Sequence, residues 1–231
     1  MRRFWKAAEV TEAASGYGIK LDGRPVKTPA RADLQVPTMA LATALAAEWN
    51  GCGEEVEPSA MPLTGLANAA IDRIAPDKEN YAAGIASYGE TDLVCYRAEG
   101  PKMLVRWQAE SWDALLAWAR RRYDVDFVCQ TGIMHVPQAE DTVRRLAHEV
   151  AALDAFALAG LSPLVTIGGS LVAALAVLEE MLPAEAAWDA VSLDDRWQLE
   201  QWGDDREARA ALDGRRRDFL AAARFLELVR A

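Results

Sequence analysis

Hydrophobic and polar positions alternate in the first part of the chain. Phe4–Val10 and Tyr17–Leu21 follow this strand pattern, and Asp22-Gly23 after them is the pair best suited to a tight hairpin turn. In Leu41–Trp49 the apolar residues fall on one face of a helix. These patterns predict a small antiparallel sheet covered by one helix, forming a β-rich domain over residues 1–57.

Helical periodicity dominates after Pro58. The predicted helices are Leu66–Ile74, Lys78–Tyr88, Met103–Tyr123, Glu140–Leu158, Ser170–Leu182, Ala184–Ala190, Asp194–Trp202 and Glu207–Val229. The apolar runs Asp92–Arg97 and Asp126–Val136 fit extended connectors or short strands. We therefore expect an α-helical bundle domain over residues 58–231 and an α+β fold class for the whole chain.

One segment, Phe156–Leu178, is long and apolar enough to suggest a membrane helix. It has 23 residues without a charge. However, Pro163 and Gly168-Gly169 interrupt it, and no basic residues flank it. We predict two helical pieces buried in a protein core, and no membrane insertion.

Charge and cysteine content narrow the choice of partners and compartment. The 231 residues include 25 Lys and Arg against 35 Asp and Glu, giving a net charge of −10, which argues against nucleic acid as a partner. Three widely spaced cysteines do not form a disulfide framework and indicate a reducing compartment. Charged residues near the N-terminus leave no unbroken apolar stretch for a signal peptide, so we expect the fold to start near residue one.

No motif for a cofactor or metal is present. The sequence lacks a phosphate-binding loop, and His135 and His148 have no partner at metal-ligand spacing. Gly168-Gly169-Ser170 resembles a nucleophile turn superficially, but a helix start capped by Ser170 is the better interpretation. We expect no catalytic residue, no cofactor and no metal.

Paired carboxylates leave an enzyme as the alternative. Adjacent acidic residues occur at 54–55, 179–180, 194–195 and 204–205. Neighbouring residues usually point apart, so solvated helix ends explain most of these pairs. The alternative is a hydrolase or transferase that uses one carboxylate pair in a cleft between the domains, although no nucleophile, base and oxyanion set converges.

The eight tryptophans are candidates for core packing or for interface anchors. On the predicted helix Met103–Tyr123, Trp107 and Trp118 share a face while Trp112 lies about 140° away. They therefore cannot all enter one core stripe. Trp197 and Trp202 lie beside acidic residues near the C-terminus.

Several motifs in order along the chain resemble one family. These are R-F-W-K at residues 3–6, L-D-G-R-P-V-K-T-P at 21–29, L-A through E-W at 41–49, P-S-A-M-P-L-T at 58–64, A-I-D-R at 70–73, T-D-L-V-C-Y-R at 91–97, Gln108 with Trp112-Asp113, Gly132-Ile133, Gly169-Ser170, and W-Q with W-G at 197–203. The chain resembles the chaperone family that assembles the catalytic head of the F-type ATP synthase by binding its alpha subunit.

This resemblance implies a function, a fold and a location. It implies an ATP-independent chaperone that is not an enzyme, keeps the unassembled alpha subunit from aggregating and hands it to the beta subunit. The implied fold is a small antiparallel β-rich N-terminal domain followed by a larger orthogonal helical bundle. The implied location is the bacterial cytoplasm, with the mitochondrial matrix for eukaryotic relatives. We expect a monomer when the protein is free; a scaffold without a single client is a third alternative.

The family's need for an acidic residue upstream of its W-G motif places the partner-binding site near residue 194. The candidate partner-binding residues are Asp194, Asp195, Trp197, Gln198, Glu200 and Trp202. Helical spacing puts positions 194, 197, 198 and 201 on one side. Asp194 could instead be only an N-cap. The helix Met103–Tyr123 is the next candidate.

Overall fold

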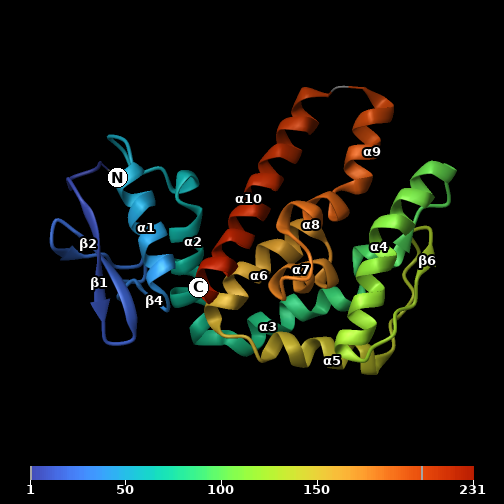
Figure 1. Cartoon of the computed structure of the whole chain (residues 1–231), viewed down its shortest axis with the longest axis horizontal. Coiled ribbons are helices and arrows are strands. Elements are labelled where there is room, and N and C mark those ends of the chain that lie inside the picture. Colours follow the sequence, from blue (N-terminus) through green and yellow to red (C-terminus); the bar gives the residue numbers. More distant parts are fainter. Residues whose placement is uncertain (1, 204) are drawn as a thin grey trace. The chain divides into compact units, whose positions relative to one another are not determined.

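The computed structural model describes residues 2–203 and 205–231, except the side chain of Trp202 (Figure 1). Its strands are β1 (Ala8–Ala13), β2 (Gly16–Leu21), β3 (Arg24–Pro25), β4 (Gln35–Val36), β5 (Tyr96–Arg97) and β6 (Gln130–Thr131). Its α-helices are α1 (Met39–Gly51), α2 (Pro62–Ala69), α3 (Lys78–Ala86), α4 (Lys102–Tyr123), α5 (Glu140–Ala151), α6 (Ala155–Gly168), α7 (Leu171–Leu178), α8 (Ala184–Val191), α9 (Leu193–Trp202) and α10 (Arg206–Arg230).

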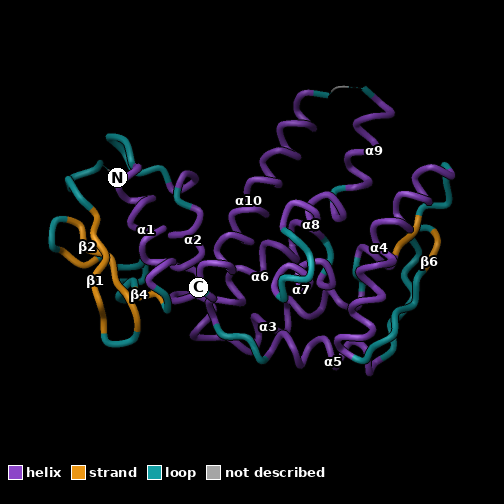
Figure 2. The backbone as a smooth tube through the Cα atoms, viewed as in Figure 1, coloured by secondary structure: helices purple, strands orange, loops and turns teal. Residues whose placement is uncertain are grey.

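The chain forms two compact units. Unit 1 comprises Met1–Lys78, Asp154–Gly160 and Ala221–Ala231, and unit 2 comprises Glu79–Leu153 and Leu161–Leu220. The sequence-based boundary after residue 57 differs from this division, because α2 and two distant helical segments belong to the same compact unit as the N-terminal sheet. The α+β class, with a small antiparallel sheet in the N-terminal part and mainly helices elsewhere, is confirmed (Figure 2). Strands β5 and β6 add a short parallel pair in unit 2.

The sheet of unit 1 is built around β2. Strand β1 pairs with β2 from Ala8 opposite Leu21 to Ala13 opposite Gly16, and β3 and β4 also pair with β2 in antiparallel fashion. Between β2 and β3, Asp22 and Gly23 have φ angles of 45° and 81°. These are the left-handed values of a two-residue hairpin turn, so the turn expected from the sequence is confirmed.

The carboxylate of Asp22 also fixes the entry to β1. It accepts hydrogen bonds from the backbone N–H groups of Lys6 and Ala7 at 3.0 Å. These two bonds hold the pKa of Asp22 below its usual value. The turn residue thus performs two tasks, because its backbone reverses the chain and its side chain anchors a segment fifteen residues earlier.

Helix α1 packs on this sheet and also receives α2. Leu41, Leu45 and Trp49 on its inner face are buried. Glu48, on its next face, accepts hydrogen bonds at 2.8 Å from the backbone N–H groups of Leu63 and Thr64, the first turn of α2. A carboxylate at a helix N-terminus satisfies N–H groups that have no partner within the helix.

Helix α7 lies at the centre of unit 2. Its residues Leu171–Val177 are all buried, as expected for a helix that is apolar on every side. The neighbouring half of α6 contributes Leu161, Leu164 and Val165 to the same core. The segment Phe156–Leu178 therefore forms two helical pieces, as predicted. Within the described part of the chain, no helix is long and apolar enough to cross a membrane.

One predicted helix was wrong. The structure divides Glu140–Leu158 into α5, which ends at Ala151, and α6, which begins at Ala155. Asp154 causes the division, because its side chain accepts a hydrogen bond at 2.8 Å from the backbone N–H of Ala157. This bond caps a new helix at a position where hydrophobic periodicity alone continues the old one.

A fully buried carboxylate, Asp92, connects the loop before β5 with α7. Its two oxygens accept hydrogen bonds from the backbone N–H groups of Val94 at 3.2 Å and Val172 at 2.8 Å. Ser170, the N-cap of α7, also interacts with it. Burial raises the pKa of Asp92 to about 6, although these hydrogen bonds oppose the shift.

Replacing Gly23 by alanine should destabilise the protein by about 1–2 kcal/mol, because an L-residue is disfavoured at φ 81°. No atom lies within 4 Å of the added Cβ, so steric collision does not contribute. The matched control is Gly65→Ala in α2, where space is equally open and φ is not positive. Urea unfolding of both variants tests this, and equal stabilities for the two would contradict it.

Replacing Asp92 by asparagine should change how stability depends on pH. The fold raises the pKa of Asp92 from 3.8 to about 6, so between these pH values the folded state holds the proton more tightly than the unfolded state. The parent's free energy of unfolding should therefore fall by about 2–3 kcal/mol relative to Asp92→Asn as pH rises from 4 to 6.5. Urea unfolding across this range measures the difference, and a difference that does not vary with pH would refute the assignment.

Candidate functional site

The candidate residues of α9 lie in unit 2. The helix begins at Leu193, with Ser192 as its N-cap residue, and the backbone N–H of Arg196 donates to the Ser192 carbonyl at 3.0 Å. Asp194 is therefore inside the first turn. Its alternative interpretation as the N-cap was wrong, because the helix starts one residue earlier than the acidic pair suggested.

Asp194 contacts α4 through a buried glutamine. The side-chain amide of Gln108 donates to Asp194 Oδ1 at 2.8 Å, while its oxygen accepts from the backbone N–H of Ala98 at 2.8 Å. Gln108 is only 1% exposed, so it holds Asp194 half-buried. Burial raises the pKa of Asp194, the Gln108 hydrogen bond acts in the opposite direction, and the charge of Asp195 adds to the rise.

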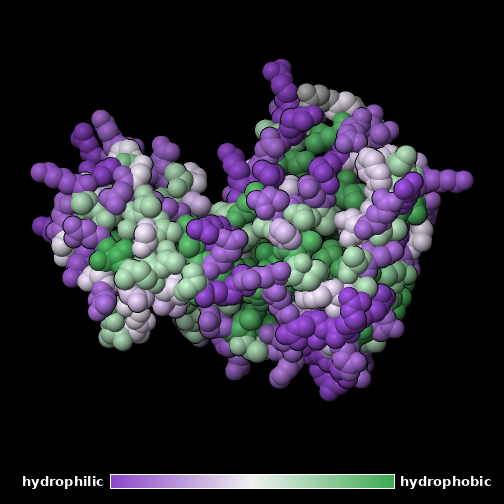
Figure 3. Space-filling view, in the orientation of Figure 1, coloured by the Kyte–Doolittle hydropathy of each residue, from purple (hydrophilic) through white to green (hydrophobic). Residues whose placement is uncertain are grey.

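Asp195 points toward a different helix. It forms an ion pair with Arg215 of α10 at 2.8 Å. Together with Gln198 and Leu199 it lines a hollow of about 350 Å³ between α9 and α10, where apolar side chains are visible in Figure 3. Gln198 lines this hollow, whereas Asp194 does not.

Two tryptophans meet beside Asp194. Trp107 of α4 and Trp197 of α9 form an edge-to-face pair with ring centroids 5.1 Å apart. Trp107 remains 37% exposed, whereas Trp112 is fully buried and donates from its indole N–H to the Ala190 carbonyl at 2.8 Å. The expected division of the tryptophans of α4 is confirmed, with Trp112 on the core side.

An open groove of about 480 Å³ lies along this pair. It is lined by Trp107, Glu110, Ser111, Ala186, Asp189, Ala190, Leu193, Arg196, Trp197 and Glu200. Its residues come from α4, α8 and α9. The structure thus brings Trp197 and Glu200 into one groove next to Asp194. It adds Trp107 from the helix Met103–Tyr123, which the sequence offered as the next candidate, while the buried Gln108 supports Asp194 from the same helix. The side chain of the remaining candidate, Trp202, lies outside the described residues.

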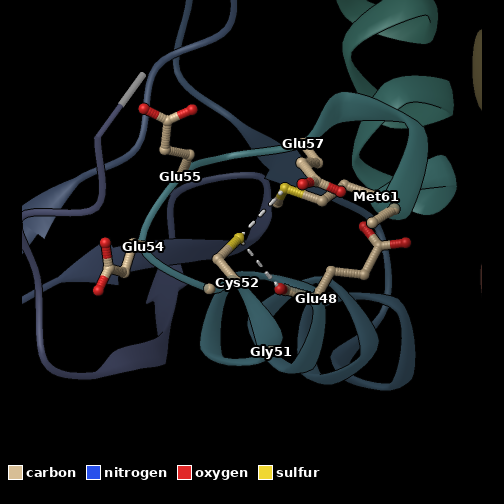
Figure 4. Close-up of a pocket in the computed structure, with 9 residues that line it drawn as sticks. Glu48, Gly51, Cys52, Glu54, Glu55, Glu57 and Met61 are labelled. Carbon is tan, nitrogen blue, oxygen red and sulfur yellow. Dashed lines mark hydrogen bonds between the residues drawn. The ribbon is translucent and has the colours of Figure 1, made fainter.

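A second pocket, in unit 1, carries several carboxylates. It measures about 470 Å³ and is lined by Glu48, Gly51, Cys52, Gly53, Glu54, Glu55, Glu57, Ala60 and Met61. Cys52 Sγ faces Met61 Sδ at 3.5 Å, as Figure 4 shows. Among residues 2–203 and 205–231, no three His, Cys, Asp or Glu side chains are arranged to hold a metal ion. Glu48 is already engaged in capping α2.

Charged side chains near the C-terminal end of α4 form intramolecular contacts. Glu179 accepts from the hydroxyl of Tyr123 at 2.7 Å and pairs with Arg122 at 2.5 Å. Arg120 pairs with Asp126 at 2.8 Å. These contacts give Glu179, one member of the carboxylate pair at 179–180, a structural role.

Comparison with known proteins assigns the family. The model of the ATP12 chaperone protein family matches residues 2–120, just over half of the chain. The mitochondrial protein atp12 of Schizosaccharomyces pombe is 26% identical over 214 residues, covering 87% of this chain and 74% of its own.

Solved structures agree over almost the full length. The crystal structure of Atp12 from Paracoccus denitrificans is 41% identical, with a TM-score of 0.94, and the match covers 99% of this chain and 98% of the relative. The Atu1473 protein of Agrobacterium tumefaciens is 37% identical, with a TM-score of 0.92, covering 98% of this chain and 85% of that one. The chain therefore belongs to the ATP12 chaperone family, a family of ATP synthase assembly chaperones.

Proposed function

We propose that this chaperone binds the unassembled alpha subunit of ATP synthase, prevents its aggregation and releases it to the beta subunit. The observation that carries the proposal is the half-buried carboxylate of Asp194 beside the partly exposed tryptophan pair Trp107 and Trp197. A subunit surface awaiting its neighbour is apolar with embedded charges, and aromatic anchors with a complementary carboxylate suit such a surface.

The state of Asp194 favours a role in binding. Gln108 holds the carboxylate in place, yet a neutral amide does not neutralise its charge. A cationic side chain of the client that reached Asp194 would complete an ion pair in a partly desolvated place, where such pairs are stronger than on an open surface. The carboxylate of Asp195 is less available to a partner, because it already forms an ion pair with Arg215.

We further propose that the protein acts as a monomer without turning over nucleotide, in the bacterial cytoplasm. Identity to the bacterial relatives is 41% and 37%, against 26% to the mitochondrial protein of Schizosaccharomyces pombe, which supports a bacterial location. The enzyme alternative is not favoured by the family. The carboxylate pair at 194–195 also does not suit acid–base catalysis, because Asp194 contacts α4 and Asp195 contacts α10.

Isolated alpha subunit that is diluted from denaturant should stay in solution when this protein is added at about equimolar ratio. Suppression should be the same with and without ATP, because a binding surface rather than hydrolysis shields the client. Light scattering during refolding measures this, with serum albumin as the protein control. Unchanged aggregation at several-fold excess, or protection only during ATP hydrolysis, would refute the proposal.

Replacing Asp194 by asparagine tests the proposed contact. The variant keeps an oxygen that accepts from Gln108, so the fold should survive, but the loss of charge should weaken binding of the alpha subunit by about 2–5 kcal/mol. Asp194→Lys should weaken binding further through charge reversal.

Titration calorimetry against the alpha subunit measures both variants, with circular dichroism to check folding. Asp195→Asn is the matched control, because it removes the adjacent charge from a carboxylate that Arg215 already occupies. If the folded Asp194 variants bind as tightly as the parent, the contact lies elsewhere on the protein.

A further inference from the structure

The groove beside Asp194 has an apolar floor that is not filled by the described part of the chain. Ala186, Ala190 and Leu193 line it together with the rings of Trp107 and Trp197. Its volume of about 480 Å³ lies within the range of about 300–1,000 Å³ that is typical of pockets binding small ligands. A single bulky apolar side chain therefore fits it.

The apolar surface continues beyond the groove along α4. Met103 lies one helical turn before Trp107 on the same face, and it is 51% exposed. When one side chain of a client segment occupies the groove, a neighbouring residue of that segment can therefore contact Met103. Flexible methionine beside rigid tryptophan is a combination suited to binding varied apolar groups.

The rim of the groove is acidic, and one of its carboxylates is unengaged. Glu110 pairs with Arg106 at 2.7 Å, and Asp189 pairs with Arg196 at 3.3 Å. Glu200 is exposed, and none of the residues that the structure describes pairs with it. The rim therefore carries three carboxylates against two guanidiniums, those of Arg106 and Arg196. The carboxylate that remains available, Glu200, stands one turn after Trp197.

A neighbouring hollow differs from the groove in its balance of charges. It measures about 300 Å³, and it also contains Asp189, Arg196 and Glu200. Its remaining charged residues are Arg209, Asp213 and Arg216, which bring it to three positive and three negative side chains. A cationic segment is thus attracted to the tryptophan groove and not to the hollow beside it.

We propose that the groove binds one segment of the alpha subunit in which a large apolar side chain, seated on the apolar floor against the paired rings of Trp107 and Trp197, is followed by a lysine or arginine that pairs with Glu200. This inference rests on the proposed function and specifies which part of the client is recognised. A second copy of this chain is a poorer occupant, because each copy has a net charge of −10 and the rim is itself acidic.

Two variants test the two halves of the proposal. Ala186→Phe fills the apolar floor, and Glu200→Lys reverses the available charge. The matched controls are Ala114→Phe, which adds the same ring at an exposed position of α4 outside the groove, and Glu12→Lys, which makes the same change in net charge on the sheet of unit 1. All four variants are compared with the parent by circular dichroism and thermal melting.

Binding of the alpha subunit is then measured by surface plasmon resonance at several salt concentrations. Each groove variant should lose affinity by on the order of tenfold, and Glu200→Lys should also slow association and flatten its salt dependence. The two controls should bind like the parent. Among overlapping peptides that cover the alpha subunit, those bound by the parent but not by Ala186→Phe should contain the apolar and basic pair. Glu200→Gln serves if the lysine variant fails to fold.

The outcomes separate this inference from the proposed function. If the parent does not bind the alpha subunit, the proposed function fails and this inference fails with it. If Asp194→Asn loses binding while Ala186→Phe and the Glu200 variants bind like the parent, the function stands and the groove proposal is overturned. If sedimentation shows a dimer of the parent that the groove variants abolish, a second copy occupies the groove, and the proposal is likewise overturned.

Discussion

The buried carboxylate of Asp92 is the contact on which the core of unit 2 depends. Helix α7 is apolar on every side and needs a polar group to satisfy the free N–H groups of its first turn. Ser170 caps one of them by accepting from Ala173 at 3.0 Å, and Asp92 accepts another from Val172. Eighty residues of chain separate Asp92 from Val172, so a single side chain fixes the loop before β5 against the central helix.

Unit 1 uses carboxylates in the same way. Glu48 caps α2 from α1, and Asp22 anchors the segment before β1. Asp72 accepts from the hydroxyl of Thr28 at 2.6 Å and from the backbone N–H of Ala30 at 2.9 Å, which ties the segment after β3 to the helical segment that follows α2. Much of the acidic character of the motifs in this unit therefore serves folding, because buried or half-buried backbone groups require partners.

The surface around Asp194 differs from these structural carboxylates in one physical respect. Asp22 and Asp92 are each surrounded by several N–H donors, whereas Asp194 has, among the residues that the structure describes, the single amide of Gln108. Beside it, Trp107 is exposed by more than a third although it forms a ring pair with Trp197. A partly satisfied charge and a partly covered aromatic pair are features of a surface that completes its contacts with a partner.

The sequence by itself determined the local structure and most of the helices. Asp22-Gly23 specifies the hairpin because few other residue pairs accept left-handed backbone angles, and the period of the apolar residues defines helices such as α4 and α7. The motifs spread along the chain also sufficed to indicate the chaperone family. Each of these features depends on residues close together in the chain or on their order.

Only the tertiary structure decided which long-range partners those residues meet. A helical pattern shows that Trp107 and Trp112 lie on different faces, but the packing of α8 determines that Trp112 is the buried one. The division of 140–158 into two helices depends on the capping hydrogen bond of Asp154. The spacing of apolar residues does not indicate this bond. The partner of Asp194 lies 86 residues away, on α4, and hydrogen bonds over such distances follow from how helices pack, which no local pattern encodes.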